Sequence, residues 1–192
     1  MGALRRSVRG WIGGLLALGI VLGAQPAGAE LSIADLNVFL NDFDLTVQLV
    51  LVDAIPASFL ESLQSGIAME ARLVVELWQY TRFWRDTLIH QRAVERQLTY
   101  NVLAKEYKVS TTGEDREPYL TKDLREAQRV LSDVRGLKLV HMSKLDPREL
   151  FYVRTRAEVS IGGPNTFFAR RFGQAEATDW VISPLLTITR RQ

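Results

Sequence analysis

The chain contains no cysteine and only two histidines among its 192 residues. Without cysteine it can form neither a disulfide nor a lipoprotein attachment, so its stability must come from an ordinary apolar core. The histidines, His90 and His141, lie far apart in sequence and lack a carboxylate at a familiar ligand spacing, which gives metal binding little support. After the first residues, no apolar stretch reaches the roughly 20 residues that a membrane-spanning helix needs.

Familiar catalytic and cofactor-binding motifs are also missing. The sequence has no Gly-x-Ser-x-Gly elbow, no phosphate-binding loop and no dinucleotide fingerprint. The glycine-containing segment 162–165 indicates a turn, because no helix follows that could complete an anion cradle. We therefore predict no catalytic residue, no cofactor and no metal ligand. A hydrolase that assembles its site from His90 or His141 and a strand carboxylate is the alternative.

The clearest positive signal lies at the start of the chain. Three arginines form a basic leader: Arg5, Arg6 and Arg9. An apolar run over residues 11–22 follows, and Ala27-Gly28-Ala29 has the small-x-small pattern that signal peptidase reads. We predict a secretory signal peptide over residues 1–29, cleaved after Ala29, and a periplasmic mature protein that meets the membrane only during export. An uncleaved anchor and twin-arginine export are the alternatives.

Removal of this leader changes the charge balance. The 24 basic and 22 acidic residues of the whole chain become 21 and 22 when the three leader arginines are taken away. The mature protein is then close to neutral, so no overall field favours nucleic acid or anionic lipid. Residues 30–192 have the length of one domain with a full core.

Alternation of apolar and polar residues dominates residues 30–192 and predicts half-buried strands. The predicted strands span 31–40, 45–51, 69–77, 94–104, 137–142, 151–161 and 180–189. A turn at Asn41-Asp42 makes the first two a hairpin. A change of phase at Trp78 indicates a β-bulge, unless the strand keeps its phase and is buried on both sides, and a second change at Tyr107 indicates another bulge.

Two helices are predicted between the strands. Pro56 and Gly66 mark the start and end of a short one. The other runs over 121–135, with Thr121 as its cap and Gly136 after its end. Hairpin-length turns favour antiparallel pairing. We predict an α+β fold, mainly an antiparallel β-sheet with two helices packed on it, and a two-sheet sandwich is the close alternative.

One cluster has the composition of a binding surface. It contains six aromatic and basic residues: Trp78, Tyr80, Arg82, Phe83, Trp84 and Arg85. Trp and Arg dominate the hot spots of interfaces, and aromatic rings also anchor proteins at membranes. We predict a binding site here, and the alternative is that the rings close one end of the core. Three nearby strand carboxylates are interpreted as solvated surface groups: Glu70, Glu76 and Glu95.

Several of these features occur together in a recognisable order. They are Ile55–Leu63, Ser65-Gly66-Ile67, the strand Glu70–Leu77, the cluster through Asp86, Leu98–Leu103 with Tyr107, the helix Leu124–Leu131, Phe151–Arg154 and Trp180–Ser183. This order resembles the bacterial domain-of-unknown-function 4390 family, although Gly162–Asn165 stands where that family has a leucine-proline segment. The resemblance implies an exported protein with no established activity and brings no catalytic residue. It also suggests a role in envelope sensing, because members are often encoded near membrane sensor kinases.

Taken together, these features predict a non-enzymatic binding or accessory protein of the cell envelope. Its expected partner is an envelope protein, such as the periplasmic domain of a sensor kinase. The alternative is an envelope protein that binds an apolar ligand or lipid, because curved antiparallel sheets covered by helices can enclose a pocket. No nucleic-acid partner is expected.

Overall fold

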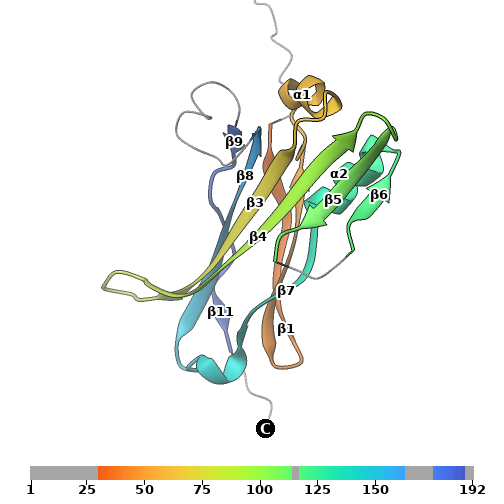
Figure 1. The fold of residues 1–192 in the computed structure, drawn as a ribbon. Coiled ribbons are helices and arrows are strands. Elements are labelled where there is room, and N and C mark those ends of the chain that lie inside the picture. Colours follow the sequence, from red (N-terminus) through yellow and green to blue (C-terminus); the bar gives the residue numbers. More distant parts are fainter. Residues whose placement is uncertain (1–29, 114–116, 163–174, 189–192) are drawn as a thin grey trace, which may run out of the picture.

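The computed structural model describes residues 30–113, 117–162 and 175–188 (Figure 1). The predicted signal peptide lies outside these ranges, as do Gly163–Asn165 of the predicted turn. Within them the protein is α+β and mainly antiparallel β, as predicted. None of its described helices has the length and apolar character of a membrane span.

The strands form two sheets. The smaller sheet has the order β1-β2-β7 and consists of β1 (Ser32–Asn41), β2 (Asp44–Val52) and β7 (Asp133–His141). The larger sheet has the order β10-β8-β3-β4-β5-β6, and β9 and β11 also pair with β8. Its strands are β3 (Met69–Tyr80), β4 (Thr87–Asn101), β5 (Glu106–Thr111), β6 (Tyr119–Thr121), β8 (Leu150–Ile161), β9 (Ala175–Ala177), β10 (Val181–Ile182) and β11 (Leu186–Thr187). The predicted hairpin at Asn41-Asp42 is present, with its turn at Asp42-Phe43.

Both sheets contribute to one apolar core. In β3 every second residue from Met69 to Leu77 is buried, and β8 has the same alternation over Phe151–Ile161. These side chains share a cluster with Val47 and Leu49 of β2, which are fully buried. The two-sheet alternative therefore describes the layers correctly, and the opposite face of β3 and β8 is left as the outer face of the larger sheet.

The first predicted helix is present in a shorter form. A 3-10 turn (Ala57–Phe59) leads into α1 (Leu60–Gln64), which lies at one end of the sandwich (Figure 1). Phe59 and Leu63 are buried there. Gly66 follows with a φ of +90°, a conformation that favours glycine.

The second predicted helix is present but shorter than the predicted 121–135. Helix α2 spans Leu124–Ser132, and Asp123 rather than Thr121 is its N-cap, accepting a hydrogen bond from the amide of Arg125. The chain then enters β7, where Val134 pairs with Leu49 of β2. Gly136 therefore lies inside a strand, with a φ of +66°, and does not end the helix. Pairing with β2 overrides the helical pattern.

The two predicted bulges have different outcomes. Beside Trp78 the register between β3 and β4 does shift, but the extra residue is Ile89 of β4, and β3 keeps its phase along β8. The predicted bulge at Tyr107 is wrong, because a turn at Val102–Lys105 separates β4 from β5. The Asn101 side chain fixes this turn by accepting hydrogen bonds from the amides of Leu103 and Ala104.

Candidate functional site

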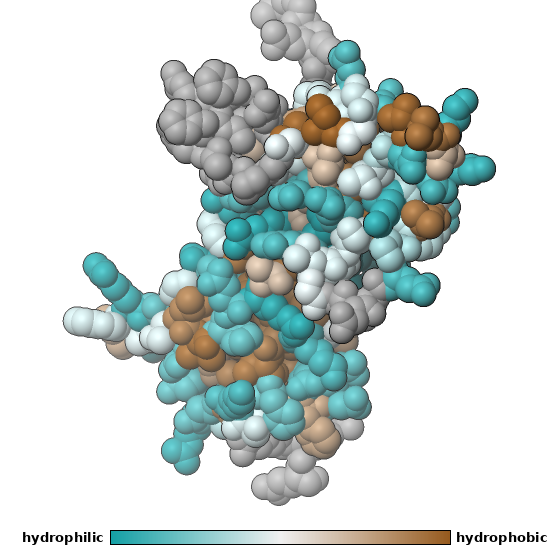
Figure 2. All heavy atoms as spheres, in the orientation of Figure 1, coloured by the Kyte–Doolittle hydropathy of each residue, from teal (hydrophilic) through white to brown (hydrophobic). Residues whose placement is uncertain are grey.

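The outer face of the larger sheet is divided into a charged end and an aromatic end. Because β3 pairs with β8 without interruption, outward residues of the two strands lie opposite each other. Towards the start of β3 these pairs are polar and include Arg72 opposite Glu158. Towards its end they are aromatic or apolar, with Trp78 opposite Tyr152 and Tyr80 opposite Leu150. Figure 2 shows one group of apolar side chains in the lower part of the molecule, framed by polar ones, and separate smaller groups at its upper end.

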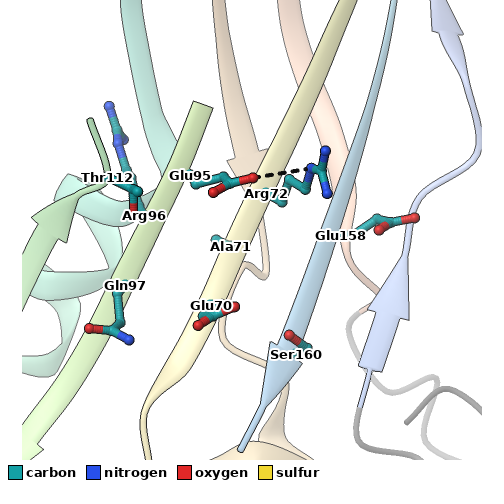
Figure 3. Close-up of a pocket in the computed structure, with 9 residues that line it drawn as sticks. All are labelled: Glu70, Ala71, Arg72, Glu95, Arg96, Gln97, Thr112, Glu158 and Ser160. Carbon is teal, nitrogen blue, oxygen red and sulfur yellow. Dashed lines mark ion pairs between the residues drawn. The ribbon is translucent and has the colours of Figure 1, made fainter. Parts of the chain in front are cut away.

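The charged end contains a shallow hollow of about 360 Å³ (Figure 3). Arg72 of β3 forms an ion pair with Glu95 of β4, with 3.4 Å between Nε and Oε1. Both side chains are about half exposed, at 54% and 47%. Glu95 therefore lies on a hydrated surface, which agrees with its interpretation from the sequence, whereas Glu70 is partly buried. Exposed ion pairs of this kind contribute little to stability.

The aromatic end is named here the aromatic face. Five of its members lie on the outward side of neighbouring strands: Trp78, Tyr80, Leu88, Tyr152 and Ile182. The sixth, Trp180, contacts Arg154 on the same side. Ile182 is 59% exposed and Leu88 42%. Large apolar groups that are exposed side by side on a sheet are typical of interaction surfaces. Of the six residues predicted to bind, Trp78 and Tyr80 lie on this face.

An ion pair between a half-buried arginine and a buried glutamate lies at the centre of the aromatic face. Arg154 of β8 is bound to Glu76 of β3, with 2.5 Å between Nε and Oε2. The indole NH of Trp78 donates to the same carboxylate oxygen at 2.8 Å. The guanidinium carbon lies 4.3 Å from the ring centroid of Trp78 and 4.4 Å from that of Trp180. Glu76 is only 8% exposed, so its interpretation as a solvated group is wrong.

The other four predicted residues occupy the tip of the β3–β4 hairpin, which projects beyond the rest of the larger sheet (Figure 1). All four are exposed: Arg82, Phe83, Trp84 and Arg85. Phe83 is 87% exposed and Trp84 is 82% exposed. The alternative that these rings close one end of the core does not describe their position. Residues 82–85 form the tip of the hairpin.

Asp86 fastens the tip to the sheet. One carboxylate oxygen accepts from the amide of Thr81 at 2.9 Å, and the other accepts from the hydroxyl of Tyr152 at 2.9 Å. Burial, followed by this hydrogen bond, raises the pKa of Tyr152 above its ordinary value of 10.0. The phenol therefore stays protonated as a donor at neutral pH, and the Asp86 carboxylate is directed towards the sheet.

The histidines occupy separate sheets. His90 is exposed on β4, and His141 is exposed at the end of β7. The Nδ1 atom of His141 lies 2.8 Å from the hydroxyl of Ser143, two residues along the chain, and accepts from the Ser143 amide. These contacts cap the 3-10 turn Met142–Lys144. Over the described ranges, no group of three or more potential metal-ligating side chains is present.

The sequence identified one side of this site and did not connect it with the other. Arg154, Tyr152, Trp180 and Ile182 come from β8 and the segment after it, and they meet Trp78 only through strand pairing. The available signal was that aromatic and basic residues also occur on the outward parity of the predicted strand 151–161. That signal does not specify the register that places Arg154 opposite Glu76.

A family model described as Domain of unknown function (DUF4390) matches residues 28–170. The match includes β1 to β8, the projecting hairpin and the Glu76–Arg154 pair. It ends before Trp180 and Ile182, which complete the aromatic face. No curated protein and no solved structure matches the chain.

Proposed function

The chain belongs to the domain-of-unknown-function 4390 family, and from this premise we propose that it is an exported, non-enzymatic binding protein of the bacterial cell envelope. Its partner would be an envelope protein, for which the periplasmic domain of a membrane sensor kinase is our leading candidate. The leader-like sequence of residues 1–29 supports export. The observation that carries the proposal is the aromatic face with the Glu76–Arg154 pair at its centre.

The chemistry of this face suits a protein partner. Tryptophan, tyrosine and arginine supply most of the binding energy at protein interfaces, particularly where their polar groups are already paired. Here Trp78 and Arg154 both donate to the Glu76 carboxylate. A partner that covers them therefore leaves no buried charge without a counter-charge. Ile182 and Leu88 offer exposed apolar area beside them. A partner would therefore remove apolar surface from water at little electrostatic cost.

Photo-crosslinking in cells is the first test. A photoreactive residue at position 182 should capture one envelope protein, and the same residue at position 103 is the matched control. Leu103 is also apolar, and it is 96% exposed on the distant β4–β5 turn. Capture at 182 that is no more specific than capture at 103 would count against the aromatic face.

Binding between purified proteins is the second step. Ile182→Glu should weaken binding of the captured protein by at least about tenfold, because a charge would be desolvated at the interface. Leu103→Glu should leave binding unchanged. Equal affinities of the two variants would refute this function for the face. A catalytic role and an apolar-ligand role have no comparable support in the described residues. The hollow at the charged end is lined by charged and polar residues together with Ala71.

A further inference from the structure

The tip differs from the aromatic face in shape. Phe83 and Trp84 are 87% and 82% exposed, so almost nothing of the protein surrounds them. In protein interfaces the strongest side chains lie near the centre of a patch whose rim excludes water. The tip has no such rim. A projecting pair of aromatic rings instead suits a deformable environment that can surround both rings.

The charges of the tip have one sign. Arg82 and Arg85 flank the two rings, and Arg82 lies over Phe83, with 5.3 Å between its guanidinium carbon and the ring centroid. The nearest carboxylate in sequence, that of Asp86, is directed back to Thr81 and Tyr152. The tip therefore presents two cations and two apolar rings at one point. Residues 30–192 are close to neutral overall, but a charge acts over about one Debye length, so the local sign decides what the tip attracts.

We propose that the tip inserts Phe83 and Trp84 into the interfacial layer of an anionic phospholipid bilayer, with Arg82 and Arg85 at the headgroup phosphates. Aromatic rings favour this layer because one side of their environment is apolar and the other is wet. Arginines next to them gain attraction to anionic lipid headgroups. The contact is small, so binding is weak and reversible. This departs from the expectation that the protein meets the membrane only during export.

Membrane contact by the tip does not depend on the function proposed for the aromatic face. The two surfaces lie on one hairpin, however, since Trp78 and Leu88 precede and follow the tip on β3 and β4. A protein held at the bilayer by its tip would present the aromatic face close to the membrane surface. Two weak contacts on one molecule would then reinforce each other through effective concentration.

Insertion can be measured directly because the chain has no cysteine. Phe83→Cys, labelled with an environment-sensitive fluorophore, is mixed with vesicles of phosphatidylcholine containing about a third phosphatidylglycerol. We expect a blue shift and increased emission. Leu103→Cys, labelled in the same way, is the matched control on the other exposed turn and should not respond. An unresponsive probe at 83, or an equal response at 103, would overturn the proposal.

Vesicle flotation of the exported full protein gives a second measurement. Phe83→Ser with Trp84→Ser should lower binding by about tenfold, because the buried apolar area is lost. Arg82→Gln with Arg85→Gln should lower binding and flatten its dependence on salt. Val102→Ser with Leu103→Ser removes apolar groups from the other turn and should have no effect. Unchanged binding in both tip variants would refute insertion.

A protein occupant of the tip gives a different result. In that case a photoreactive residue at position 84 would capture one specific protein, and the fluorophore at 83 would not respond to vesicles. That combination would overturn the lipid proposal and leave the aromatic face untouched. The two proposals can fail independently. Ile182→Glu tests only protein binding by the aromatic face and should not change vesicle binding by the tip.

Discussion

Arg154 binds Glu76 on the outer face of the larger sheet, and its guanidinium group lies against the indole rings of Trp78 and Trp180. The Glu76 side chain is 10% exposed, whereas the Arg154 side chain is 31% exposed. The register of β3 and β8 places the two residues directly opposite each other. A carboxylate removed from water in this way depends on its partner, because an unpaired buried charge is costly.

Arg154→Leu should therefore destabilise the protein by about 2–3 kcal/mol, somewhat less than for a fully buried pair because Arg154 is partly hydrated. Urea unfolding measures the loss. Arg72→Leu breaks the exposed pair with Glu95 and serves as the control, with an expected cost below about 1 kcal/mol. Adding Glu76→Leu to Arg154→Leu should recover stability, since no charge then remains buried. Equal losses in the two arginine variants would contradict this account.

The Asp86 contacts predict a local effect at the hairpin. Asp86→Ala removes acceptors for the Thr81 amide and the Tyr152 hydroxyl. Hydrogen exchange at the Thr81 amide should become faster, while global stability falls by only about 1 kcal/mol. Tyr152→Phe removes just one of the two contacts and should leave Thr81 protected. If exchange at Thr81 is unchanged in Asp86→Ala, another group holds the hairpin.

Strand alternation was the most informative property of the sequence. It predicted β3 and β8 within a few residues, because both strands have one face in the core and their side chains must alternate. It failed where one segment fits two patterns. Val134 continues the apolar stripe of α2 and also fits the alternation of β7, and only pairing with Leu49 of β2 decides between them.

The candidate site shows the same limit. Trp78, Tyr80 and the tip lie within one short stretch of the chain, residues 78–85, so composition alone identified them. The Glu76–Arg154 pair joins residues of different strands, and Arg154 also contacts Trp180 from a third segment. Glu76 follows the polar parity of β3 and was therefore interpreted as solvated. Local periodicity gives the face that a side chain occupies but does not show what covers that face.

Arg96 of β4 holds the C-terminal end of α2 against the larger sheet. Its Nη1 atom donates to the carbonyl oxygens of Val130, Leu131 and Asp133 at 2.7, 2.9 and 2.8 Å, at the end of the helix where carbonyls lack helical partners. Arg96→Ala should cost about 1–3 kcal/mol in urea unfolding and speed hydrogen exchange in α2. Arg92→Ala, which loses a single bond to the carbonyl of Lys138, should cost less. The reverse order would show that Arg96 does not cap the helix.

Glu126 should contribute to the loss of folding stability at acid pH. Its carboxylate accepts from the hydroxyl of Tyr119 at 2.5 Å and from that of Thr121 at 2.7 Å. These hydrogen bonds, that of Tyr119 first, hold the pKa of Glu126 below its ordinary value of 4.5. The unfolded chain therefore binds a proton more readily than the folded one. Stabilisation is complete above the unfolded pKa and is lost as the pH falls through the folded pKa.

Urea midpoints measured between about pH 7 and pH 3 test this linkage. The native chain should lose stability at the acid end, and Glu126→Gln should lose less there because it has no carboxylate to protonate. Tyr119→Phe removes the first donor, so the pKa of Glu126 should rise towards its ordinary value and the loss of stability at acid pH should become smaller. Identical curves for Glu126→Gln and the native chain would show that this carboxylate does not link protonation to folding.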